Sequence, residues 1–141
     1  MKSLIQWLGV LVTITWSFAS NLDYVTTAGV VNIEPVIDGH IINDPAWESF
    51  PGINTFTQKS PDEGEPVTER TVVKVMYSSN TLYIAAVCYD VNPEKIVITD
   101  TRRDAPLNNT DSFMFILDTF QDQQNGYVFG TNAGGIEYDA Q

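Results

Sequence analysis

The residues best suited to bind a ligand lie in one polar segment, residues 101–110, just ahead of the most apolar stretch after the leader. Guanidinium and carboxylate groups form charge-assisted hydrogen bonds with hydroxyl groups, and amide side chains both donate and accept such bonds. The segment carries all three kinds of group, and its candidate ligand-binding residues are Arg102, Arg103, Asp104, Asn108 and Asn109. Alternatively, the two arginines only pair with the many carboxylates of the chain.

A second chemistry, the binding of a hard cation, would use acidic turns further along the chain. Calcium is held by several carboxylate and carbonyl oxygens. Asp90 opens the turn "DVNPE", and Asp118 and Asp122 belong to the turn "DTFQDQQNG", so these three aspartates are the candidate calcium ligands. Neither spacing is that of an EF-hand, and solvated acidic turns are the alternative.

Composition excludes several other functions. With 18 acidic against 7 basic residues the net charge is −11, which makes nucleic acid and anionic lipid poor partners. Cys88 and His40 are the only residues of their types, so an intrachain disulfide, cysteine-based zinc sites and multi-histidine metal sites are excluded. No sequence motif of a hydrolase or phosphate-binding loop occurs, and carboxylate pairs can always be proposed in so acidic a chain. We therefore name no catalytic residue and expect no catalysis from these residues alone.

The N-terminus indicates a compartment. Lys2 precedes a mostly apolar run that ends at Phe18, and Ser17 and Ala19 are the small residues that precede a cleavage site. We predict a signal peptide over residues 1–19 and a lead-in over residues 20–33, hence a secreted, periplasmic or outer-membrane-surface protein. An uncleaved membrane anchor is the alternative.

Hydrophobic patterns predict an all-β, antiparallel β-sandwich. Residues 71–77 alternate between apolar and polar, and residues 81–89 are apolar on both faces, which predicts a hairpin whose second strand is central and holds Cys88 in the core. Further strands are predicted at residues 95–99, 111–120 and 126–133. Two prolines, a glycine and four acids make residues 56–69 an exposed loop.

The stretch "VIDGHIINDPAW" predicts a structural corner rather than a site. Asp38 and Gly39 form a turn, after which Asn43 or Asp44 caps a short helix with Pro45 in its first turn. Trp47 then covers the core, because burying an indole ring removes a large apolar area from water. His40 is expected to be a solvated turn residue.

Three stretches together resemble the family 9 carbohydrate-binding modules: "PVIDGHIINDPAW", "VVKVMYSSNTLYIAAVCYD" and "TDSFMFILDTFQDQQNGYVFGTNAGG". The resemblance covers residues 34–141. It implies a β-sandwich, bound calcium and recognition of polysaccharide or oligosaccharide ends, often beside xylan- or cellulose-degrading glycoside hydrolases. The match is similar above all to the N-terminal module of bacterial surface proteins with a barrel-like region further on.

The chain departs from the sugar-binding members of that family at their ligand contacts. No tryptophan precedes Asp111, Met114 stands in place of a glutamate, and "VFGTN" offers no arginine. The second clamping tryptophan would lie beyond Gln141, and because the sequence stops within "GGIEYDAQ" we expect a sandwich cut short at its C-terminus. The sequence thus predicts a carbohydrate-binding module accessory to a hydrolase or an outer-membrane protein. The alternative is a structural or interaction domain beside a C-terminal barrel or catalytic region.

Overall fold

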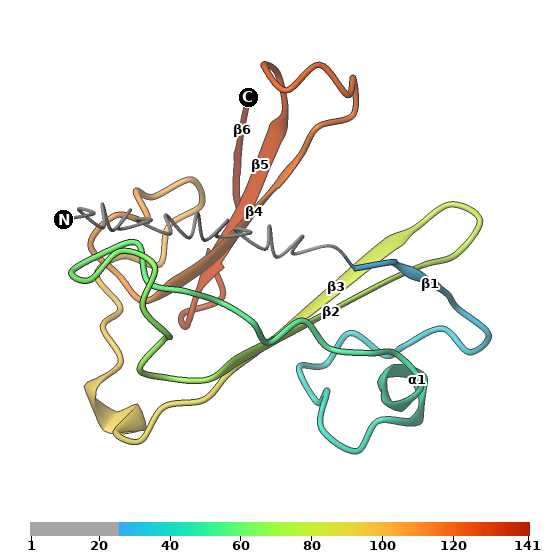
Figure 1. Cartoon of the computed structure of the whole chain (residues 1–141), viewed down its shortest axis with the longest axis horizontal. Coiled ribbons are helices and arrows are strands. Elements are labelled where there is room, and N and C mark those ends of the chain that lie inside the picture. The colour runs from blue at the N-terminus through green and yellow to red at the C-terminus, as the bar shows by residue number, and fades with distance from the viewer. Residues whose placement is uncertain (1–25) are drawn as a thin grey trace, which may run out of the picture.

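The computed structural model describes residues 26–141, which form two three-stranded sheets with very little helix (Figure 1). The expected all-β class is confirmed at this level. The predicted signal peptide and the first residues of the predicted lead-in lie outside the described residues.

The first sheet has the order β1-β2-β3, where β1 is Gly29–Val30, β2 is Thr71–Tyr77 and β3 is Leu82–Cys88. β2 and β3 form the expected antiparallel hairpin, and Ser78 N–H donates to the carbonyl of Thr81 to close the turn. The prediction that the second strand is central was wrong, because β1 pairs in parallel with β2 and leaves β3 at the edge. Cys88 ends that edge strand and is exposed rather than part of the core.

The second sheet has the order β4-β5-β6 and is antiparallel throughout, with β4 at Ser112–Leu117, β5 at Tyr127–Asn132 and β6 at Tyr138–Ala140. β4 ends three residues earlier than predicted. The carboxylate of Asp118 accepts the backbone N–H of Gln123 at 2.9 Å and so bends the chain into a turn.

The predicted strand at residues 95–99 is absent. Pro93–Lys95 forms a single 3-10 turn, η1, and Val97 follows it. Val97 N–H donates to the carboxylate of Asp111 at 2.6 Å rather than to a neighbouring backbone carbonyl, so no ladder continues from it. The backbone N–H of Asp111 donates in turn to the carbonyl of Val97 at 2.9 Å, so Asp111 bonds to both backbone groups of Val97.

The corner around Trp47 has the predicted form. Helix α1, Pro45–Glu48, is capped by Asp44, whose carboxylate accepts Ala46 N–H at 2.8 Å. Trp47 is 3 % exposed and packs with Met76 and Ala85 of the first sheet. Asp38 accepts the N–H of the exposed His40, and Gly39 has φ +80°, which favours glycine. The predicted loop at residues 56–69 is indeed largely exposed.

Each sheet is covered on one face by its own cluster. Helix α1 and the segment before it cover the first sheet, and Ala105, Leu107 and Ile136 form a separate cluster with Tyr138 of the second sheet. In Figure 1, α1 and the β4–β6 sheet lie on opposite sides of β2 and β3. The remaining faces of the two sheets therefore both border the space between them.

Candidate functional site

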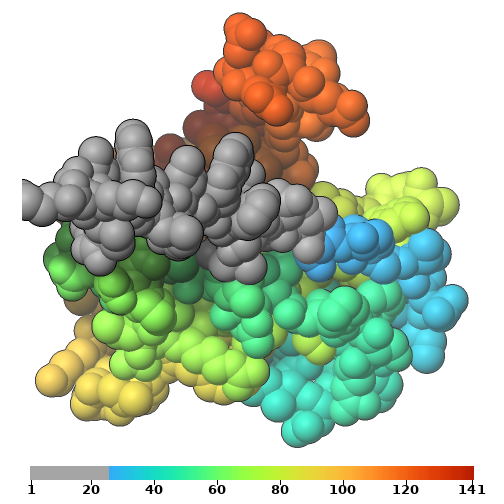
Figure 2. All heavy atoms as spheres, viewed as in Figure 1, coloured from blue at the N-terminus to red at the C-terminus, as the bar shows by residue number. Residues whose placement is uncertain are grey.

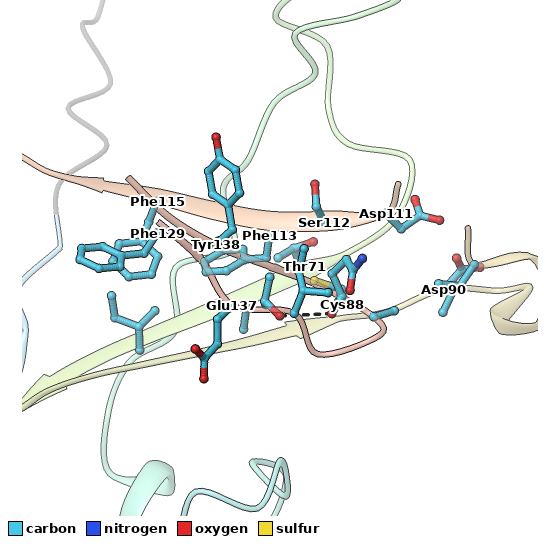
Figure 3. A pocket seen from close by; sticks show the side chains of 18 of the residues that line it. Thr71, Cys88, Asp90, Asp111, Ser112, Phe113, Phe115, Phe129, Glu137 and Tyr138 are labelled. Carbon is cyan, nitrogen blue, oxygen red and sulfur yellow. Dashed lines mark hydrogen bonds between the residues drawn. The ribbon is translucent and has the colours of Figure 1, made fainter. Parts of the chain in front are cut away.

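A cleft of about 960 Å³ lies between the two sheets and is lined by residues of both (Figure 3). Side chains alternate between the faces of a strand, so paired residues of neighbouring strands share a face. The pairs Thr71 with Cys88 and Val75 with Ile84 therefore put Thr71, Ile84 and Cys88 on the side of the first sheet that lines the cleft.

The second sheet contributes an aromatic surface to the cleft. Phe113 and Phe115 are two positions apart along β4 and so share a face, and Phe115 pairs directly with Phe129 of β5. The rings of Phe115 and Phe129 are stacked with centroids 5.5 Å apart, and the centroids of Phe113 and Phe115 are 6.2 Å apart. In Figure 3, Phe115 and Phe129 lie side by side, while Thr71 and Cys88 come from the other sheet.

The rim of the cleft is acidic. Its carboxylates belong to Glu69, Asp90, Asp111, Glu137 and Asp139, and among residues 26–141 the one basic residue in the lining is Arg103. Arg103 forms ion pairs with Asp104 at 3.3 Å, Glu137 at 2.5 Å and Asp139 at 2.6 Å. The pKa of Arg103 is raised, first by the negative charge of Asp104, then by the hydrogen bond and charge of Asp139 and by the charge of Glu137. This guanidinium therefore stays charged while it holds β6.

The five predicted ligand-binding residues do not gather at one site, because only Arg103 lines the cleft. Arg102 turns to Asp100, with its Nη2 2.6 Å from a carboxylate oxygen, and this hydrogen bond strongly lowers the pKa of Asp100. Asp104 accepts Asp139 N–H at 3.3 Å. Asn108 and Asn109 lie in an exposed turn. Both arginines thus form ion pairs with carboxylates, which is the alternative that the sequence left open for them.

The predicted calcium ligands are divided between two places. Asp90 lines the cleft, whereas Asp118 and Asp122 meet in the β4–β5 turn. The oxygens of Asp118 accept N–H groups of Asp122 and Gln123. Within residues 26–141, no group of three acidic, histidine or cysteine side chains is placed to hold a metal ion. In this turn, oxygens of both carboxylates accept hydrogen bonds from amide groups.

Hydrogen bonds in that turn shift the titration of both aspartates. The N–H of Gln123 is the main cause that lowers the pKa of Asp118. For Asp122 the main cause is the amide of Asn125, which donates at 2.8 Å and lowers its pKa. Both carboxylates thus act as charged caps that hold the turn.

Sequence reasoning missed the cleft residues that matter most. The sequence shows that Phe113 and Phe115 lie two positions apart in one strand and that Phe129 lies in the next. It does not show that the face they share would be turned toward the other sheet. Asn132 was also missed: it lines the cleft, is 6 % exposed, and its amide donates to the carbonyl of Asp100 at 2.8 Å. A buried amide at a strand end gives no periodic signal.

Neither protein-family models, curated proteins nor solved structures give a match to this chain. Across residues 26–141 there is no helix with the length and apolar character needed to cross a membrane.

Proposed function

We propose that this chain is a secreted or outer-surface carbohydrate-binding module that holds an oligosaccharide in the cleft between its sheets. The carrying observation is the stacked pair Phe115 and Phe129 inside a cleft of about 960 Å³ with a charged rim. We further propose that the two sheets are the halves of a β-sandwich related to the family 9 modules.

The chemistry of the cleft suits a sugar for two reasons. Aromatic rings can cover the apolar C–H face of a sugar ring. Carboxylates such as Asp111 and Glu137 can accept hydrogen bonds from its hydroxyl groups, and these bonds are stronger than neutral ones. A neutral oligosaccharide would also meet no repulsion from the acidic rim.

A second candidate function is a structural or interaction domain that binds another protein. It is favoured by the state of Arg103, whose guanidinium is already held by three carboxylates. A sugar hydroxyl would have to compete with those ion pairs, whereas an apolar protein segment could fill the cleft and leave them intact.

Calorimetric titration with xylo- and cello-oligosaccharides, in millimolar calcium and again with a chelator, tests the first candidate. We expect saturable heat that Phe115→Leu reduces, because leucine keeps the apolar character but lacks an aromatic face. Arg103→Ala should also weaken binding, whereas the neighbouring Arg102→Ala, whose partner is Asp100, should not. Absence of heat from folded protein with every sugar would overturn the proposal. Loss of heat with the chelator would show that sugar binding requires calcium.

A further inference from the structure

Strand alternation brings three carboxylates to one end of the cleft. Glu69 comes two positions before Thr71, and Asp90 comes two positions after its partner Cys88, so both continue the cleft-lining side of the first sheet. Asp111 in the same way lies two positions ahead of the first cleft-lining phenylalanine of β4. In Figure 3, Asp90 and Asp111 lie at the same end of the cleft although they come from different sheets.

The aromatic surface lies at the other end. In Figure 3, Phe115 and Phe129 are on the side away from Asp90 and Asp111. Phe115 is four residues along the chain from Asp111, which corresponds to about 13 Å at the usual rise of a strand, so a ligand that touches both ends is longer than one sugar ring. Figure 2 shows the β4–β5 turn standing well apart from the β2–β3 turn, so the sheets diverge toward the aromatic end and leave room for a chain to continue.

No cation within the described residues neutralises the acidic end. None of the ion pairs among residues 26–141 involves Glu69, Asp90 or Asp111, and the one basic residue of the lining is already held by three other carboxylates. Arg70 is next to Glu69, but its guanidinium lies over the ring of Tyr89, 5.0 Å from the centroid. Asp90 and Asp111 each use one oxygen to accept a backbone N–H, and the second oxygen of each accepts no hydrogen bond within these residues.

We propose that the ligand of the cleft is a cationic oligosaccharide, with protonated amino groups at the acidic end and a sugar ring against Phe115 and Phe129. This inference rests on the proposed function and names the class of sugar. Ammonium groups form charge-assisted hydrogen bonds with carboxylates, and a cleft lined by one sign of charge attracts ligands of the opposite sign. An oligomer of β-1,4-linked glucosamine carries an amino group on every ring, whereas cello-oligosaccharides carry a hydroxyl group at that position.

The test is calorimetry at about pH 5.5, where carboxyl groups are ionised and the amino groups of the sugar are protonated. The two ligands are the β-1,4-linked hexamer of glucosamine and cellohexaose, which differ only in the amino or hydroxyl group on each ring. We expect the glucosamine hexamer to bind at least about tenfold more tightly at low salt. We also expect added salt to reduce the ratio of the two affinities, because it screens the charges.

Variants of the protein separate a site in the cleft from general attraction to an acidic surface. Glu69→Gln removes one charge and no hydrogen bond of the described residues, and it should lower the ratio of affinities about threefold. Glu63→Gln, the same change at an exposed residue outside the cleft lining, should leave the ratio unchanged. Phe115→Leu should weaken the binding of both hexamers, because both lose the aromatic face.

Three results would overturn the inference: equal affinity for the two hexamers, a ratio that Glu69→Gln does not lower, or binding of the glucosamine hexamer that Phe115→Leu leaves unchanged. Saturable heat with cellohexaose and no preference for the glucosamine hexamer would contradict the cationic ligand alone and leave the proposed sugar binding in place. Heat with neither hexamer from folded protein would contradict both.

Discussion

At the scale of single residues, much of this fold depends on side chains that cap turns and cover sheets. Trp47 is the largest of them: it is 3 % exposed, and its carbonyl accepts a hydrogen bond from Lys74 at 2.7 Å. We expect Trp47→Ala to lower the free energy of unfolding by about 3–5 kcal/mol, because it leaves a cavity against Met76 and Ala85. Urea denaturation of the variant and of the milder Trp47→Phe measures this, and equal stability of Trp47→Ala and the parent would show that the helix does not cover the sheet.

The capped β4–β5 turn predicts an acid dependence of stability. Hydrogen bonds lower the pKa of Asp118 and Asp122 in the folded chain, so their stabilisation is complete above the unfolded value of about 3.9. It is lost as the pH falls through the lowered folded values. We expect the melting temperature to fall below about pH 4, and to fall less in Asp122→Asn, whose side-chain oxygen can still accept the N–H groups of Gln124 and Asn125. If the melting temperatures of this variant and the parent fell equally with pH, the charged caps would not contribute to stability.

At the scale of elements, close packing between β5 and the segment before β4 sets a limit on side-chain size. A Cβ atom at Gly130 would lie 2.6 Å from Cδ1 of Leu107 and 2.8 Å from Cγ of Met114. We expect Gly130→Ala to cost about 1–3 kcal/mol of unfolding free energy. A double-mutant cycle with Leu107→Ala should show a favourable coupling, since the smaller residue makes room, whereas strict additivity of the two changes would contradict this packing.

The elements also show what the sequence could and could not predict. Strands with clear alternation or long apolar runs, such as β2 and β4, were found, and the Asp44 cap with Pro45 predicted α1, because these signals are local. The strand at residues 95–99 failed because its fate depends on Asp111, which is distant along the chain and takes the N–H of Val97. Cys88 was misplaced because an apolar run does not reveal which strand will occupy the edge.

At the scale of the whole molecule, the candidate site arises only when the two sheets meet. Of the predicted ligand-binding residues, Arg103 alone lines the cleft, since Arg102 pairs locally with Asp100. The aromatic surface of Phe113, Phe115 and Phe129 depends on strand register, and the opposite wall depends on the register of β2 and β3. Long-range pairing of this kind leaves no spacing pattern in the sequence.

Cys88 offers a direct test of whether the space between the sheets is open and receives a ligand. This residue is the only cysteine of the sequence, is exposed and lines the cleft, so the rate of its alkylation reports on access to that space. The decisive measurement is the rate of Cys88 alkylation in the folded protein, without ligand and with saturating xylohexaose. We expect prompt alkylation of the free protein and at least about a tenfold slower rate with sugar, since occupancy of the cleft removes access to the thiol. A thiol that is unreactive in the free protein, or a rate that sugar leaves unchanged, would contradict the account.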